Sequence, residues 1–277
     1  MVTNWTHPEA KYGFRLQKKY CITLRSEGQR LPHRTHKPGV GGSNPPLATK
    51  KNMRPKYKFL IKRILYYFYG EKFFKRLNYE WKDYPSRISI IQSIINSKKY
   101  NDYLEIGCDK DENFSQIKIK NKVGVDPKSG GTLRMTSDEF FKTNKNKFEI
   151  IFLDGLHTYE QTIQDIKNSI KSLKTDGLIV VHDCLPKKIW NQIVPRMYGH
   201  WNGDVWKAIV ETRTLSNVDT YTCVADHGLG IILNRPNKNI LKLNVRDFKN
   251  IKFSSYYKRH KEFMNTISHN QIKEVIF

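Results

Sequence analysis

FEIIFLDGLHTYEQTIQDIKNSIKSL, residues 148–173, contains a short apolar run followed by a periodic polar segment. The first six residues are almost all apolar, which is typical of a strand buried on both faces of a parallel sheet. Apolar side chains then recur at steps of four and three, the pattern of one helix face: Tyr159, Ile163, Ile166, Ile170 and Leu173. A buried strand followed by an amphipathic helix is the unit of a parallel α/β sheet.

The same alternation continues on both sides of this unit. Short apolar strands are predicted at 103–107, 122–127 and 177–181, and residues 85–98 predict a helix with an isoleucine-rich face. Residues 220–225 and 228–233 predict a closing pair of strands. The expected fold is therefore α/β: a Rossmann-like doubly wound sheet, mostly parallel with an antiparallel closing strand and helices on both faces.

Composition divides the chain into four parts. Residues 1–52 are rich in Gly, Pro and His without periodicity, and we expect either a disordered basic tail or mis-annotated upstream sequence, with translation starting at Met53. Residues 53–99 predict basic, aromatic helices, 100–235 the core domain, and 236–277 a basic C-terminal extension. The basic aromatic segment 56–76 suits peripheral contact with an anionic membrane, or equally packing on the domain with its lysines extended into water.

The net charge of +23 is carried by the two ends of the chain. Residues 84–235 hold 21 Lys/Arg against 18 Asp/Glu, a net of only +3. A nucleic-acid binder more often has a basic stripe on its folded domain, so no nucleic-acid partner is expected. The sequence has no membrane-length apolar run and no signal peptide, which favours a cytoplasmic protein, with association at the inner membrane face as a second option. Four cysteines without a paired C-x-x-C exclude a disulfide scaffold and a cysteine zinc site.

Polar side chains stand at the ends of four of the predicted strands. The carboxyl ends of parallel strands meet at one edge of the sheet, where ligands bind in such folds. The sequence therefore predicts a binding site formed by these residues: Glu105, Gly107, Asp126, Asp154, His157, His182 and Asp183.

The loop after the first strand indicates which cofactor this site takes. Residues 107–113 contain one glycine and three acids, Asp109, Asp111 and Glu112. Those acids would repel a pyrophosphate, but they suit S-adenosylmethionine, which carries a sulfonium and an ammonium group. Asp126 lies 21 residues after Glu105, which suits an acid that holds ribose hydroxyls.

Residues 100–235 resemble the class I S-adenosylmethionine-dependent methyltransferases. More closely, they resemble a bacterial group with strand-end motifs Asp-Gly-x-His-x-Tyr and His-Asp, which stand here at 154–159 and 182–183. Residues 135–141, 201–207 and 226–230 are also similar to that group. Where the family has two further loop glycines, this sequence has Asp109 and Asp111.

The resemblance implies roles for the strand-end residues. Glu105 and Gly107 would line the methionine part of the cofactor, Asp126 would hold the ribose, and Asp138 would lie near the adenine. The methyl acceptor would face Asp154, His157, His182 and Asp183. Related O-methyltransferases hold a divalent metal such as magnesium on acids at these strand ends, which implies Asp154 and Asp183 as ligands, although His182 stands where the relatives have one more acid.

Methyl transfer to a hydroxyl oxygen needs a group that removes the hydroxyl proton. The pKa range of histidine suits His157 for that work, together with Asp154 and Asp183; the alternative is a His157 that only bonds the strand-end carboxylates. Trp201, Trp206 and Lys207 suit a lid or acceptor platform, or equally the core.

The expected activity is O-methylation of a small hydroxylated acceptor, such as a sugar of a surface glycan or its precursor. The alternatives are a non-catalytic glycan- or membrane-binding protein on the same fold, and an RNA methyltransferase. The sequence does not determine the oligomeric state.

Overall fold

The computed structural model describes residues 60–61, 64, 77–196 and 199–277 of the 277-residue chain. The predictions for residues 1–52, and for most of the segment 56–76, lie outside the described residues.

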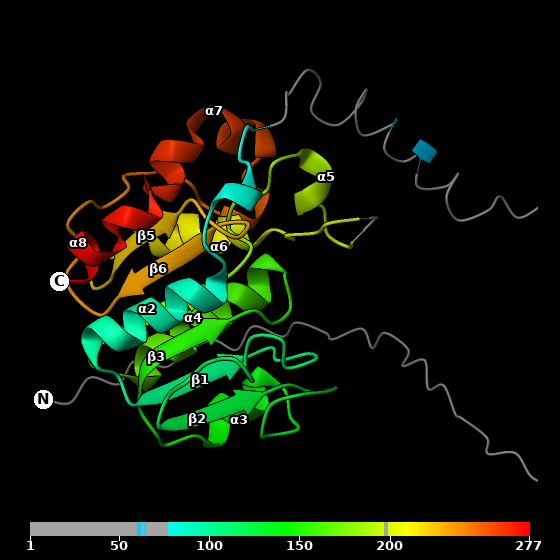
Figure 1. The fold of residues 1–277 in the computed structure, drawn as a ribbon. Coiled ribbons are helices and arrows are strands. Elements are labelled where there is room, and N and C mark those ends of the chain that lie inside the picture. Colours follow the sequence, from blue (N-terminus) through cyan, green and yellow to red (C-terminus); the bar gives the residue numbers. More distant parts are fainter. Residues whose placement is uncertain (1–59, 62–63, 65–76, 197–198) are drawn as a thin grey trace, which may run out of the picture. The chain divides into compact units, whose positions relative to one another are not determined.

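A seven-stranded sheet forms the centre of the described domain (Figure 1). Its strand order is β2-β1-β3-β4-β6-β5-β7. Six strands run in one direction, and β6 alone is antiparallel to both of its neighbours. The strand bounds are β1 Asp102–Ile106, β2 Asn121–Val125, β3 Phe148–Leu153, β4 Leu173–Val181, β5 Asp219–Cys223, β6 Leu229–Leu233 and β7 Thr266–Ile267. The predicted fold class is confirmed, including its antiparallel closing strand.

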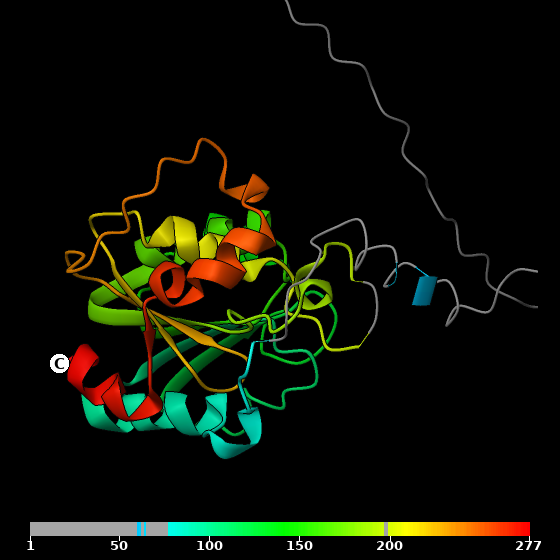
Figure 2. The same ribbon diagram turned by 90° about the horizontal axis from the view of Figure 1, so that it is seen from above.

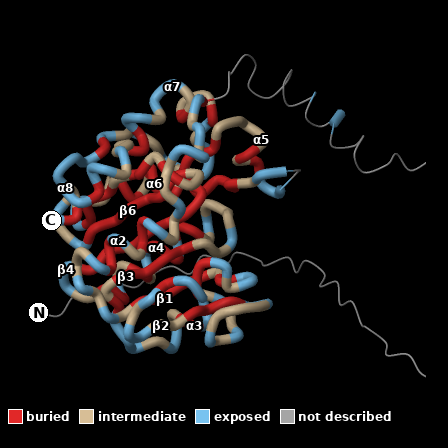
Figure 3. Tube along the Cα trace, viewed as in Figure 1, coloured by how far each residue is buried: buried red, intermediate tan, exposed pale blue. Residues whose placement is uncertain are grey.

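Helices cover both faces of this sheet (Figure 2). The longer ones are α2 Arg87–Lys98, α3 Ser137–Thr143, α4 Tyr159–Ser172, α6 Val205–Thr212 and α7 Phe253–Met264, and the short ones are α5 Ile189–Gln192, α8 Ile272–Ile276, η2 Trp81–Asp83, η3 Phe248–Asn250 and η4 His269–Gln271. Alternate residues of β3 belong to two separate hydrophobic clusters: Ile151 packs with α3, α4, α6 and α7, whereas Ile150 packs with α2 and α8. The strands β1, β3 and β6 are buried along almost their whole length (Figure 3), which explains why their sequences are largely apolar.

The start of α4 fixes the end of the β3 loop. Thr158 is the N-cap of α4, and its hydroxyl accepts a hydrogen bond from the backbone N–H of Gln161 at 3.4 Å. His157 therefore stands one residue before the N-cap of α4 and three after Asp154, at the carboxyl edge of the sheet. The predicted strand 177–181 is longer than expected, because β4 begins at Leu173 directly after α4.

The residues after 236 contribute to both hydrophobic clusters. Phe253, Tyr256 and Phe263 of α7 are buried in one cluster, and Ile272 and Ile276 of α8 in the other. Within the described part of the chain, no helix combines the length and apolar character needed to cross a membrane.

Candidate functional site

The carboxyl ends of β1, β3 and β4 bring most of the predicted site residues together. Gly107 follows β1 with φ +89°, and a Cβ placed there would lie 2.3 Å from the carbonyl oxygen of Asp154. Only glycine therefore permits the β1 and β3 loops to approach this closely. A cavity of about 210 Å³ opens beside these loops, and its lining includes Arg87, Glu105, Gly107, Asn113, Asp154 and His157.

The floor of this cavity is a buried hydrogen-bond network around Glu105. The side-chain amide of Asn113 donates to Glu105 Oε2 at 2.7 Å and to the Tyr103 hydroxyl oxygen at 3.0 Å, and the Tyr103 hydroxyl also donates to Glu105. Glu105 is 1% exposed, and this burial raises its pKa from 4.5 to about 7. The carbonyl oxygen Oδ1 of Asn113 is buried and accepts no hydrogen bond from the described residues.

Arg87 supplies a donor to the same cavity. It opens α2, and its backbone N–H donates to Asp226 Oδ2 at 2.6 Å. Its guanidinium lies between Asp226, at 3.6 Å from Nη1, and Asp154, at 4.0 Å from Nε. The buried Nε has no hydrogen-bond partner among the described residues. Asn113 and Arg87 thus both line this cavity, and each has one buried side-chain atom without a hydrogen-bond partner among the described residues, although buried polar groups are normally paired.

Asp126 ties two loops to the end of β2. Its Oδ2 accepts from the backbone N–H of Asp109 at 3.0 Å, and its Oδ1 from Lys128 at 2.7 Å and Ser129 at 3.0 Å. Burial opposes ionisation, but these N–H donors outweigh it and lower the pKa of Asp126. The carboxylate is thus fixed and charged at the rim, and its role toward a ribose stays a prediction.

The acidic loop keeps a glycine-like backbone without the family's glycines. Asp109 has φ +45° and Asp111 has φ +63°, both in the left-handed region. Aspartate tolerates this conformation better than most residues. The Asp111 carboxylate also accepts from the backbone N–H of Gly131 at 2.6 Å, which joins this loop to the one after β2.

Asp138 lies apart from the other predicted residues. It is exposed in the first turn of α3, where Oδ1 accepts from the Gln161 amide at 3.2 Å. It does not line the cavity beside Glu105. Its role near an adenine ring remains a prediction.

Next to the cavity, carboxylates and imidazoles alternate. Asp154 Oδ1 lies 3.1 Å from His157 Nε2 and 3.0 Å from His182 Nδ1. The other nitrogen of His157 lies 3.2 Å from Asp183 Oδ2, and that of His182 lies 3.4 Å from Asp226 Oδ1. Both nitrogens of each ring therefore face a carboxylate, which favours two doubly protonated imidazoles.

The ionisation of this cluster follows from its geometry. Burial lowers the pKa of His157 and of His182, but the surrounding carboxylates outweigh it and raise both pKa values above the ordinary 6.5. Burial also acts to raise the pKa of Asp154, yet the two histidines hold it well below its usual value. His157 must consequently lose a proton before it accepts one from a substrate.

The predicted metal ligands lie within reach of one ion. Ligand atoms of Asp154, His182 and Asp183 all lie within 4.8 Å of one another. Two carboxylates and an imidazole suit a divalent cation. His182 thus offers a nitrogen ligand at the position where the family relatives have a further acid.

The two site tryptophans have different environments. The Trp201 ring stacks on His157 with centroids 5.5 Å apart, and its indole N–H donates to the backbone oxygen of Ile193 at 2.7 Å. Trp206 is fully buried in the core. The sequence left open whether these tryptophans belong to the core or to the site. Trp206 belongs to the core, whereas Trp201 lies at the site.

The sequence prediction did not identify three residues of this site. Arg87 and Asp226 come from segments that precede β1 and follow β5, and Asn113 is the last residue of the acidic loop 107–113. For Arg87 the sequence did contain one signal. A cation in the first turn of a helix is unfavourable in the field of the helix dipole unless an anion lies beside it.

Part of the chain is similar to known proteins. Residues 103–184 match the family model described as a methyltransferase domain. A search of curated proteins found no match. Among solved structures, the chain is similar to an SAH-bound methyltransferase from Podospora anserina, with 15% identity, coverage of 71% of this chain and 100% of that one, and a TM-score of 0.44. It is also similar to an O-methyltransferase from Bacillus cereus in complex with SAH, with 12% identity, coverage of 69% and 94%, and a TM-score of 0.41. The family match covers β1 to β4, the strands that carry the site, and over residues 103–184 the chain is similar to a methyltransferase domain.

Proposed function

We propose that this protein transfers the methyl group of S-adenosylmethionine to a hydroxyl oxygen of a small acceptor. The observation that carries the proposal is that Asn113 and Arg87, whose buried Oδ1 and Nε have no hydrogen-bond partner among the described residues, line one cavity together with the Asp154–His157 pair. An amino-acid group carries both complementary charges, an ammonium and a carboxylate. The methionine end of the cofactor has this chemistry, and the reacting groups stand directly beside it.

Three residues of the cavity and Asp126, which lies outside its lining, divide the work of binding the cofactor. Asn113 Oδ1 and the buried Glu105 carboxylate accept hydrogen bonds from the ammonium, and Arg87 Nε donates to the carboxylate. Asp126, held charged by three backbone N–H groups, accepts from the ribose hydroxyls. The cofactor supplies a methyl group on a sulfonium centre, which the acidic loop 109–112 favours electrostatically.

His157 receives the proton of the acceptor hydroxyl. Its ring lies between Asp154 and Asp183, and these carboxylates stabilise the imidazolium that the transfer produces. Asp154, His182 and Asp183 would hold a divalent cation such as magnesium, whose charge would lower the pKa of a bound hydroxyl. The neutral form of the His157 ring is the form that acts as the base.

A sugar hydroxyl of a glycan, or of its precursor, is the acceptor that we infer. Trp201 presents an aromatic ring that stacks on His157, and aromatic faces pack well against the apolar faces of sugar rings. The basic segment 56–76 would bring the enzyme to lipid-linked precursors at an anionic membrane surface.

The test is methyl transfer from labelled cofactor to a panel of hydroxylated sugars and nucleotide sugars. We expect label on an oxygen of at least one acceptor with the unaltered protein. His157→Ala should lose this activity, and His269→Ala, which alters a histidine of η4, should retain it. Label on nitrogen atoms only, or undiminished transfer by His157→Ala, would contradict the proposal.

A further inference from the structure

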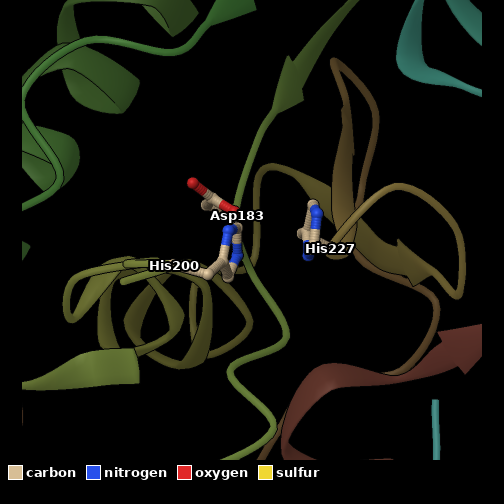
Figure 4. Close-up of side chains that lie close together, drawn as sticks. All are labelled: Asp183, His200 and His227. Atoms are coloured by element: carbon tan, nitrogen blue, oxygen red, sulfur yellow. Dashed lines mark ion pairs between the residues drawn. The ribbon is translucent and has the colours of Figure 1, made fainter. Parts of the chain in front are cut away.

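A second group of potential metal ligands lies on the outer side of Asp183. Figure 4 shows Asp183, His200 and His227, which come from three separate segments: the end of β4, the loop before α6 and the turn between β5 and β6. One ligand atom from each of these residues lies within 4.8 Å of the others.

The two oxygens of Asp183 face different neighbours. Oδ2 lies 3.2 Å from His157 Nδ1 and 3.7 Å from His182 Nδ1. Oδ1 lies 3.6 Å from His200 Nε2 and accepts from the Asn202 amide at 2.8 Å. We call Asp154, His182 and Asp183 the inner site, and Asp183, His200 and His227 the outer site. The carboxylate is shared, and each site uses its own oxygen.

The backbone holds two of the three outer ligands in place. The segments after β4 and β5 are joined by hydrogen bonds from Leu185 N–H to the His227 carbonyl at 2.8 Å and from Cys184 N–H to the Gly228 carbonyl at 3.0 Å. The His227 ring lies between two other rings, with Trp81 edge-on at 5.3 Å and His200 stacked at 3.9 Å. Asp183 and His227 are therefore a preformed pair.

The outer imidazoles have nitrogens available for coordination. Among the described residues, neither His200 nor His227 donates or accepts a side-chain hydrogen bond, in contrast to His157 and His182, whose nitrogens all face carboxylates. The planes of the two outer rings differ by 26°, so a shared ion would require one of them to turn. His200 is the ring that can do so, because its side chain is 45% exposed to solvent.

We propose that the outer site binds a divalent transition metal ion of the zinc and cobalt class. Two imidazole nitrogens and one carboxylate oxygen form a donor set that such ions prefer, whereas magnesium prefers oxygen ligands and retains its waters. The inner site, with two carboxylates and one imidazole, is richer in oxygen. The rim of this domain thus carries two cation sites of unlike selectivity that share Asp183, independently of whether the protein transfers methyl groups.

The experiment is a titration with Co²⁺, followed by its visible absorption and by calorimetry. The inner site also has ligands for Co²⁺, so the measurement begins with Asp154→Asn, which weakens the inner site and leaves every outer ligand intact. We expect the Asp154→Asn variant to bind Co²⁺ with a visible spectrum. Adding His227→Ala should weaken that binding by about 100-fold or more, since loss of a direct ligand should cost at least as much as loss of an outer-shell partner of a ligand. A millimolar excess of Mg²⁺ should not displace this Co²⁺.

A second series avoids any effect of Asp154→Asn on folding. In the otherwise unaltered chain, His200→Ala should lower the number of bound Co²⁺ ions by one, and the matched variant His269→Ala should not. The proposal is overturned if the Asp154→Asn variant has the same affinity for Co²⁺ with and without the added His227→Ala substitution. It is also overturned if the His200→Ala and His269→Ala variants bind the same number of Co²⁺ ions. Complete displacement of the ion by Mg²⁺ would also overturn the proposed selectivity.

Discussion

Glu105→Gln should stabilise the protein at alkaline pH while it weakens cofactor binding. Glu105 is 1% exposed, and burial raises its pKa from 4.5 to about 7. Glutamine has almost the same shape and retains an oxygen that can accept from Tyr103 and Asn113. The substitution therefore removes the buried charge with little change in packing.

The size of the effect follows from the pKa of Glu105. Between pH 4.5 and about 7, the folded state holds a proton on this group that the unfolded state has released. The favourable contribution of protonated Glu105 is thus fully present below pH 4.5 and is lost as pH rises through about 7. The shift corresponds to about 3 kcal/mol, at about 1.4 kcal/mol per pKa unit. Glu105→Gln should therefore gain about 3 kcal/mol in unfolding free energy at pH 8, and less than about 1 kcal/mol at pH 5.

Urea denaturation without cofactor, at both pH values, measures this difference. Glu112→Gln is the matched control, because Glu112 is an exposed acid of the same loop and should give the stability of the unaltered protein at both pH values. The reasoning is refuted if Glu105→Gln is no more stable than the unaltered protein at pH 8, or if its gain is the same at pH 5.

The same substitution tests the proposed role of Glu105 in binding. Loss of the carboxylate should weaken calorimetric binding of S-adenosylhomocysteine at pH 8 by about tenfold or more, the scale for a hydrogen bond between charged groups. Undiminished affinity would remove Glu105 from the cofactor site, whatever the stability result.

Four further predictions concern other parts of the chain. His157→Ala should lower turnover by about 100-fold or more with cofactor affinity unchanged, measured with labelled cofactor and calorimetry; full turnover would place the base elsewhere. Asp126→Ala should cost about 1–3 kcal/mol of cofactor affinity, and calorimetry that shows none of this loss would contradict the ribose role. Asp109 has φ +45°, so Asp109→Ala should lower the free energy of unfolding in urea by about 1 kcal/mol, whereas Asp109→Gly should not. Equal stabilities of the two variants would show that this backbone is unstrained. A chain that starts at Met53 should keep its melting temperature, and a large decrease would show that residues 1–52 belong to the fold.

Local periodicity was sufficient to predict most of the sheet and its helices. Strands such as Phe148–Leu153 are apolar throughout because helices cover both faces, and α4 keeps one apolar face because its other side meets water. Boundaries were less certain: nothing in residues 173–176 distinguishes the end of α4 from the start of β4, and the strand begins four residues earlier than predicted. Pairing with β3 sets that boundary, through Phe148 and Leu173.

The loop conformation also required the structure. Asp109 and Asp111 stand where the family has glycines, and the sequence alone does not say whether the loop changes shape. The structure keeps both residues in the left-handed region. Asp111 gains a hydrogen bond to the backbone of Gly131, which helps to offset the cost of that conformation.

The sequence by itself determined the fold class and the set of strand-end residues at the rim, because parallel strands necessarily bring their carboxyl ends to one edge of the sheet. Only the tertiary structure decided which groups meet there from distant segments. Arg87 and Asp226 are 139 residues apart, yet they are joined by a hydrogen bond of 2.6 Å. His200 and His227 share Asp183 only because the loop before α6 and the turn between β5 and β6 lie against the end of β4. Such contacts depend on how elements pack across the edge of the sheet, and no local pattern of residues encodes that packing.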